Sequence, residues 1–156
     1  MQGERRPARH GVLQLRDPEP RKEPEVVPRL RLIAILVSLA GVAVSIYLTV
    51  VHYAGFVPAC PVSGAISCEA VLSSPYAVIA GTSIPTSVAG ILWFGVSAAL
   101  WARPRRSLLL AWSMLGLLTV IYLLFVEIVL VGAVCLWCTA AHALVVVLVL
   151  IAVGRK

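Results

Sequence analysis

The four cysteines are the residues of this chain whose type and spacing could support chemistry. Cys60 and Cys68 are eight positions apart, and the other two form the C-x-x-C motif Cys135-Leu136-Trp137-Cys138. Thiols in such patterns can bind a metal ion, close structural disulfides or exchange disulfides with another protein. Which of these applies depends on where the chain places the sulfur atoms.

Each of these three chemistries fits part of the cysteine pattern. The C-x-x-C pair suits half of a zinc site, but the seven residues between Cys60 and Cys68 make a longer gap than structural zinc sites prefer. Structural disulfides are common in small secreted folds. A C-x-x-C motif at a helix start favours redox exchange, because free N–H groups and the helix dipole stabilise a thiolate nucleophile. We therefore favour a redox pair and expect no metal.

The composition indicates that the elements carrying these cysteines lie in a membrane. The chain has 156 residues, of which 60% are hydrophobic and 13% charged, and its mean hydropathy is +0.97. Soluble domains carry about 25% charged residues. The thirteen lysines and arginines form three groups that flank apolar stretches. This pattern excludes a nucleic-acid-binding protein, which would gather its basic residues on one face.

Four apolar stretches are long enough to cross a bilayer, which takes about 20 residues per helix. We expect spans at about 32–52, 84–102, 107–127 and 131–153. Residues 108–153 would reach roughly 69 Å as a single helix, so we place a reversal between Glu127 and Gly132, with Glu127 at the lipid–water boundary. The predicted fold class is all-α, an integral membrane four-helix bundle.

The basic residues predict the orientation, because lysine and arginine stay on the cytoplasmic side. Both termini are then cytoplasmic, and the protein is a multi-pass protein of the inner or plasma membrane. Segments 53–83 and 127–133 contain no lysine or arginine, which puts all four cysteines on the extracytoplasmic, oxidising side. Residues 1–30, rich in charge and proline, are expected to form a disordered cytoplasmic tail, and residues 31–156 the membrane domain.

Several residues near the cysteines have more than one possible role. His142 follows Cys138 by four positions and lies on the same helix face. Inside an apolar span it needs a partner, so contact with a bound ligand and a bond between helices both remain open. Trp137 could pack beside the redox pair. The roles of His52 and Glu69 also remain open.

A set of short motifs in a fixed order links the chain to a known family. The motifs are Tyr47-Leu48-Thr49 with His52, the run Ala65-Ile66-Ser67-Cys68-Glu69-Ala70-Val71-Leu72-Ser73-Ser74, Ile84-Pro85-Thr86-Ser87 before Gly90, and Cys135-Leu136-Trp137-Cys138 before His142. In this order and spacing, residues 46–142 resemble the vitamin K epoxide reductase family, in its bacterial disulfide-bond-forming branch.

The resemblance implies both a fold and a site. Four helices would surround a quinone of the menaquinone or ubiquinone type, and a short helix after Cys68 would lie in the extracytoplasmic loop. Cys138 would face the quinone, Cys135 would exchange with Cys68, and Cys60 with Cys68 would form a shuttle disulfide. Candidate quinone contacts are Ser74, Thr86, Trp137 and His142. At the position of Thr86, animal relatives have an asparagine that bonds the quinone.

The resemblance also implies a function. The protein would be a membrane thiol oxidoreductase that oxidises a thioredoxin-fold partner outside the cytoplasm and passes the electrons to a membrane quinone, which supports disulfide bond formation. Many bacterial relatives continue into a fused thioredoxin-like domain, whereas this sequence ends at Lys156, so we expect a separate, DsbA-like partner. The alternative is a membrane scaffold or transporter subunit stapled by two disulfides, in which cysteine loss would mainly lower stability.

Overall fold

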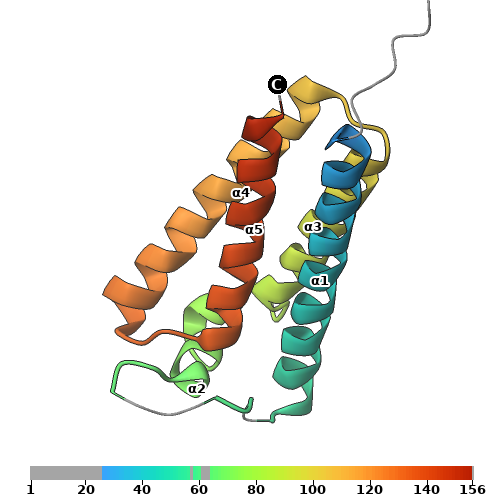
Figure 1. The fold of residues 1–156 in the computed structure, drawn as a ribbon. Helices are drawn as coiled ribbons and strands as arrows, with labels where there is room; N and C mark the ends of the chain where they lie inside the picture. Colours follow the sequence, from blue (N-terminus) through green and yellow to red (C-terminus); the bar gives the residue numbers. More distant parts are fainter. Residues whose placement is uncertain (1–25, 57, 61–63, 156) are drawn as a thin grey trace, which may run out of the picture.

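The computed structural model describes residues 26–56, 58–60 and 64–155. The regular secondary structure of this part of the chain is helical, with two isolated β-bridges and no strand (Figure 1). The four longer helices are α1 (Val26–Ala54), α3 (Thr86–Ala102), α4 (Arg106–Phe125) and α5 (Leu136–Gly154). Three short elements join them: α2 (Cys68–Leu72), the 3₁₀ turn η1 (Pro75–Ala77) and the π-helical turn η2 (Val126–Val131).

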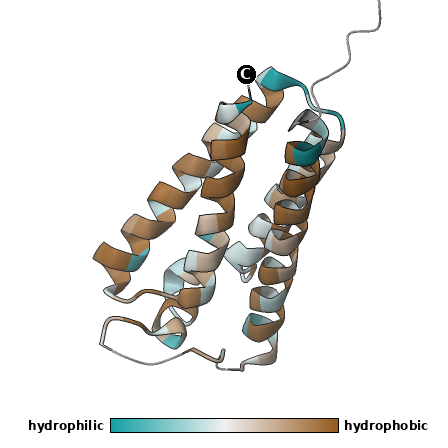
Figure 2. Cartoon of the chain, in the orientation of Figure 1, coloured by the Kyte–Doolittle hydropathy of each residue, from teal (hydrophilic) through white to brown (hydrophobic). Residues whose placement is uncertain are grey.

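Among the described residues, three helical segments are long and apolar enough to cross a membrane: Pro28–Ala54, Arg106–Val131 and Leu136–Gly154. The fourth, α3, is apolar as well but has only 17 residues. Most of the helical surface is hydrophobic (Figure 2), and large apolar side chains such as Leu36, Leu118 and Leu150 are more than half exposed. Because such surface is unfavourable in water, the fold confirms that the chain is an all-helical membrane protein.

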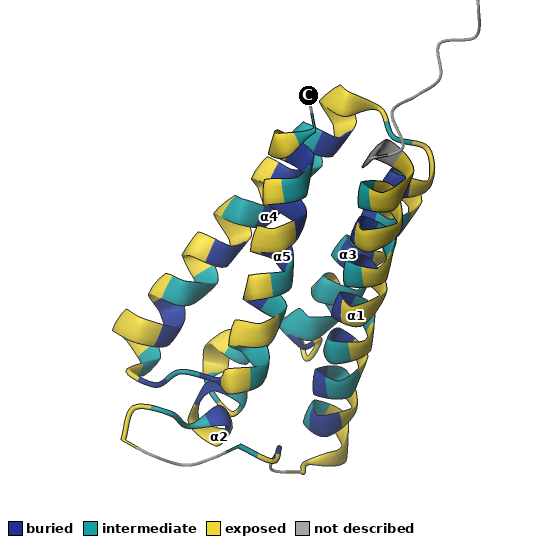
Figure 3. Cartoon of the chain, in the orientation of Figure 1, coloured by how far each residue is buried: buried dark blue, intermediate teal, exposed yellow. Residues whose placement is uncertain are grey.

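The interior depends on small residues that let the helices approach closely. α1 packs along α3 and α5, and α4 packs along α5 and also touches α3. A methyl group added to Gly41 of α1 would collide with the ring of Phe94 on α3, and one added to Gly116 of α4 would collide with Trp93. Helices in membranes commonly associate in this way. Buried and exposed positions are interleaved along each of these helices (Figure 3).

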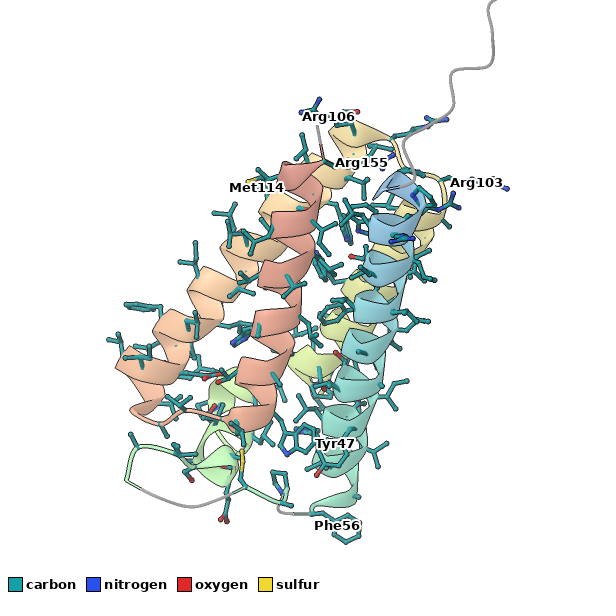
Figure 4. All side chains as sticks on the ribbon, in the orientation of Figure 1. Tyr47, Phe56, Arg103, Arg106, Met114 and Arg155 are labelled. Atoms are coloured by element: carbon teal, nitrogen blue, oxygen red, sulfur yellow. A yellow bond between two sulfur atoms is a disulfide. The ribbon has the colours of Figure 1, made fainter. Side chains whose placement is uncertain are left out.

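The basic residues and the cysteine-bearing segments lie at opposite ends of the molecule. Arg103, Arg106 and Arg155 gather at one end in Figure 4, and Arg31 there donates a hydrogen bond to the backbone carbonyl of Ala102. The opposite end contains the final turn of α1, the loop with α2, and the start of α5 (Figure 1). This separation is what the distribution of lysine and arginine predicts.

Two helix boundaries differ from those predicted. α1 begins at Val26, so residues 26–30, assigned above to a disordered tail, are helical. Pro28 fits there because a helix's first turn has no internal bond for its missing N–H. The predicted tail otherwise lies outside the described residues.

The second difference is at α5, which begins at Leu136 instead of near residue 131. Gly132 takes the left-handed conformation, with φ of 70°, and ends the helix that η2 continues. The residues after Gly132 then bond to the loop that carries α2, as described below, and so cannot start α5 earlier.

Candidate redox site

A short backbone pairing fixes the two cysteine-bearing segments side by side. Ile66 and Val134 form a parallel β-bridge. The N–H of Ser67 donates to the carbonyl of Val134 at 3.1 Å, and the N–H of Val134 donates to the carbonyl of Ala65 at 2.8 Å. Because Cys68 and Cys135 directly follow these paired segments, the pairing places one cysteine of each pair next to the other.

The first pair, Cys60 and Cys68, forms a disulfide with a Cα–Cα distance of 6.1 Å. Cys68 is the first residue of α2, where the hydroxyl of Ser67 caps the helix by accepting the N–H of Ala70 at 3.2 Å. The cap orders the turn that holds Cys68. A short helix in the loop after Cys68, as the family resemblance implied, is therefore present.

All four cysteines belong to one apolar cluster. Cys68 and Cys135 are buried in it together with Val71 and Ala133, and Cys60 and Cys138 pack against it half-buried. Cys135 and Cys138 are free thiols, so the two pairs differ in oxidation state. Sulfur atoms gathered in this way can exchange disulfides without a large movement of the backbone.

The C-x-x-C motif begins α5, as its sequence predicted. Cys135 is the N-cap residue, and its Sγ accepts the backbone N–H of Cys138 at 3.3 Å. The pKa of the Cys135 thiol is lowered from its ordinary value, chiefly because the Cys138 thiol donates a hydrogen bond to it, although burial and nearby Glu127 act in the opposite direction. Cys135 is therefore the better thiolate of the pair.

A cavity of about 680 Å³ lies against the motif, lined by residues of α1, α3, α4 and α5 and by the segment around η1. Cys138, Thr86 and His142 line it, and so does His52. Ligand sites in proteins commonly enclose about 300–1,000 Å³ within mostly apolar walls. The second cysteine of the motif thus faces a space large enough for an organic molecule.

A second, smaller cavity of about 60 Å³ adjoins the same cysteine. Cys138, Thr86 and His142 line this cavity too, together with Ser74 and Glu127. Of the four predicted quinone contacts, Thr86 and His142 thus lie on both cavities and Ser74 on the smaller one alone. The hydroxyls of Ser74 and Thr86 already donate to backbone carbonyls, so each offers a ligand an acceptor.

Trp137, the remaining predicted contact, lines neither of these two cavities. Its indole N–H donates to the carbonyl of Ala59 at 3.2 Å, and its ring centroid lies 4.7 Å from that of Tyr47. It packs against the cysteine cluster. Trp137 therefore ties the residue before Cys60 to the start of α5.

Glu127, which was expected at the lipid–water boundary, is buried at the predicted reversal. Glu127 is only 4% exposed, and its Oε2 has no hydrogen-bond partner. The sequence does contain a feature that could have indicated this, because Glu127 is the only formal charge between residues 108 and 153. An ionisable residue inside an apolar span points to function. Glu69, in contrast, is exposed on α2.

Comparison with known proteins identifies the family. A search among curated proteins gives no match. The model of the vitamin K epoxide reductase family matches residues 32–153. This range contains all four cysteines and every residue that lines the two cavities. The chain therefore belongs to the vitamin K epoxide reductase family and is a membrane thiol oxidoreductase.

Proposed function

We propose that the protein belongs to the bacterial disulfide-bond-forming branch of this family. It oxidises a reduced thioredoxin-fold protein outside the cytoplasm and passes the electrons to a membrane quinone. The observation that carries the proposal is the gathering of a Cys60–Cys68 disulfide and a Cys135/Cys138 dithiol in one cluster, with Cys138 facing a large cavity.

The first half of the reaction is disulfide exchange. A thiolate of the partner attacks Sγ of Cys60, which is half-buried, whereas Cys68 is almost fully buried. Cys68 leaves as a thiolate and attacks Cys135 of the oxidised inner pair, and Cys138 leaves in turn. The partner's second thiol then attacks the mixed disulfide between the partner and Cys60, which oxidises the partner and releases Cys60 as a thiolate. Cys60 attacks Cys68, which re-forms the Cys60–Cys68 disulfide and releases Cys135. The partner ends oxidised and the inner pair reduced, so electrons and disulfide bonds balance.

The second half reoxidises the inner pair at the large cavity. A bound quinone supplies an acceptor for two electrons and two protons. Two buried nitrogen atoms in its lining, Nε1 of Trp93 and Nδ1 of His142, have no hydrogen-bond partner. Such groups are costly when buried alone, and they suit the carbonyl oxygens of a quinone. His142 and Trp93 would therefore orient the ring, with Cys138 beside it.

The same proposal includes a topology. We infer that α3 is a fourth span, because its 17 residues reach about 26 Å and meet the lower limit for crossing a bilayer. The four helices then form a transmembrane bundle. The arginine-rich end faces the cytoplasm with both termini, and the cysteine cluster faces the oxidising side.

A scaffold or transporter subunit held together by disulfides is the competing function. The gathering of both cysteine pairs in one cluster beside a large cavity counts against it, because structural staples need neither contact with each other nor space for a ligand. In such a scaffold a cysteine substitution would lower stability without affecting any electron transfer.

The test uses purified full-length protein in vesicles that contain menaquinone or ubiquinone, with a reduced DsbA-like protein as electron donor. We expect quinone reduction, followed by its absorbance, in proportion to the donor thiols oxidised. Cys138→Ala abolishes it while the protein remains folded. Leu136→Ala, an exposed position of the same motif, keeps the rate within about twofold. If the wild type reduces neither quinone and all Cys→Ala variants simply unfold, the scaffold is correct.

A further inference from the structure

Glu127 is held in an unusual piece of backbone beside the redox motif. It lies in the π-helical turn η2, and its carbonyl accepts N–H groups from Gly132 and, at 3.1 Å, from Ala133. π-helical turns inside helices occur frequently at functional sites. The turn packs against α2, which carries Cys68. The backbone at Glu127 is thus fixed between the two cysteine-bearing segments.

The carboxyl group of Glu127 has no structural partner that explains its burial. Its Oε2 is buried without a hydrogen-bond partner. The labelled arginines, Arg103, Arg106 and Arg155, lie at the opposite end of the helices (Figure 4). A buried, unpaired carboxyl group is costly. A structural role alone would be served better by an apolar side chain.

A small cavity joins this carboxyl group to Cys138 and to His142. All three residues line the space of about 60 Å³. Two buried atoms of these residues, Oε2 of Glu127 and Nδ1 of His142, have no hydrogen-bond partner. A water molecule needs about 10–15 Å³ of such space and two to four polar partners. The cavity therefore has room and hydrogen-bonding groups for water between Glu127 and His142.

The small cavity shares part of its wall with the large one. Cys138, His142 and Thr86 line both cavities. Glu127 lines the small cavity alone. A proton that leaves Cys138 can therefore reach Glu127 on one side, and a proton on His142 can reach the large cavity on the other.

We propose that Glu127 is the proton carrier of the inner redox pair. The proposal rests on the proposed function and deepens it. In the full step two S–H bonds break, one S–S bond forms between Cys135 and Cys138, and the quinone, as oxidant, gains two electrons and two O–H bonds. The carboxylate of Glu127 takes the proton of the Cys138 thiol and returns it, through cavity water and His142, to the quinone oxygen. The quinone takes its second proton from water. Cys135 has released the proton of its own thiol to water, so the protons balance.

The groups that face Glu127 come from several elements. Cys135 is the N-cap residue of α5, and Cys138 and His142 follow within that helix. Tyr76 of η1 lines the small cavity together with Cys138 and His142. On α2, Cys68 is held in its disulfide and Glu69 is exposed. Among these groups, Glu127 is the buried carboxyl group on the small cavity, so its substitution tests the carrier directly.

The test compares Glu127→Gln, which removes the titrating group, with Glu69→Gln, which removes a carboxylate at the same end of the molecule. In single-turnover quinone reduction we expect Glu127→Gln to be slowed at least 10-fold, since positioned proton transfer contributes about 10²–10⁴-fold. In wild-type protein the rate of quinone reduction should rise with pH, because the carrier must be a carboxylate to accept a proton. This rise should be absent in Glu127→Gln. Glu69→Gln keeps the wild-type rate and profile. Disulfide exchange with the partner, which precedes this step, is unchanged in both variants.

A second measurement needs no quinone. Oxidation of the inner pair in quinone-free protein should change the carbonyl band of a carboxylic acid in the infrared difference spectrum, and this band should be absent in Glu127→Gln alone. A third uses Glu127→Ala, in which added formate should restore quinone reduction severalfold, because formate fits the vacated space as a base. Formate should leave Glu127→Gln unchanged.

The outcomes separate the two proposals. If wild-type protein reduces no quinone, the proposed function fails. If it does, and Glu127→Gln matches Glu69→Gln in rate, pH profile and infrared spectrum, the proton carrier is refuted and the proposed function stands. A variant that has also lost disulfide exchange is misfolded, and the decision then rests on formate rescue of Glu127→Ala: restoration supports the carrier, and its absence overturns it.

Discussion

Cys68 and Cys135 are both buried in the same apolar cluster although 67 positions separate them in the chain. Their closeness results from the bridge between Ile66 and Val134, which aligns the residues just before each cysteine. One cysteine of the outer pair and one of the inner pair are therefore brought together by backbone bonds, which do not depend on the identity of any side chain. The exchange between the pairs should be sensitive to this bridge.

Val134→Pro tests the bridge. Proline removes the N–H that Val134 donates to Ala65, and the lost bond contributes about 0.5–1.5 kcal/mol. In a Cys60→Ala, Cys138→Ala background, which leaves one cysteine of each pair, we expect Val134→Pro to reduce the yield of the Cys68–Cys135 cross-link, measured by mass spectrometry. Val134→Ala keeps the N–H and should keep the yield. Equal yields in all three proteins would show that the cysteines meet without the bridge.

The hydrogen bond within the motif predicts a pH dependence. The Cys138 thiol lowers the pKa of Cys135 by donating to its sulfur, so the Cys135 thiolate persists to lower pH than an ordinary thiolate does. Ultraviolet absorbance of the thiolate in quinone-free, reduced protein follows this titration. Cys138→Ala removes the donor and should move the transition to higher pH, whereas Cys138→Ser retains a hydroxyl donor and should move it less. An unchanged transition in Cys138→Ala would contradict the assignment.

Much of this architecture could be predicted because membrane helices carry strong sequence signals. Apolar stretches separated by basic residues indicate the helices, and a C-x-x-C motif just after a glycine turn indicates the start of α5. The exact ends could not be predicted. The start of α5 at Leu136 depends on the bonds of Val134 to the loop, and a pairing between distant segments leaves no periodic pattern in the sequence.

The redox cysteines of the site could be predicted from the sequence, whereas the residues that line the cavities beside them were harder to predict. Cysteine spacing carries chemical information by itself, whereas the walls of a cavity depend on how helices pack. Thr86 and His142 do line both cavities, but Trp137 instead bonds Ala59. Glu127 looked like a boundary residue because hydropathy does not show which way a side chain points at a turn.

The close approach of α1 and α3 predicts a steric effect on stability. A methyl group on Gly41 would overlap the ring of Phe94, and such overpacking costs about 1–3 kcal/mol. Gly41→Ala should therefore lower the thermal unfolding midpoint in detergent. Gly95→Ala, on the same helix as Phe94 but with nothing within 4 Å of the added methyl group, should leave it unchanged or raise it. Phe94→Leu should partly restore Gly41→Ala; if it lowers stability further, the overlap is not the cause.

The large cavity predicts a separation of the two half-reactions. Ala141 lines the cavity on α5, and its neighbour Ala140 is exposed. Ala141→Trp should fill part of the 680 Å³ space and raise the KM for quinone or abolish its reduction, because the ligand and the indole compete for one volume. A single round of disulfide exchange with the partner should proceed normally, since Cys60, Cys68 and Cys135 lie in the cysteine cluster and do not line this space. Ala140→Trp adds the same bulk outside the cavity and should preserve both half-reactions. If Ala141→Trp reduces quinone with the wild-type KM and kcat, the quinone binds elsewhere, and the assignment of Cys138 as the residue that faces it must be abandoned.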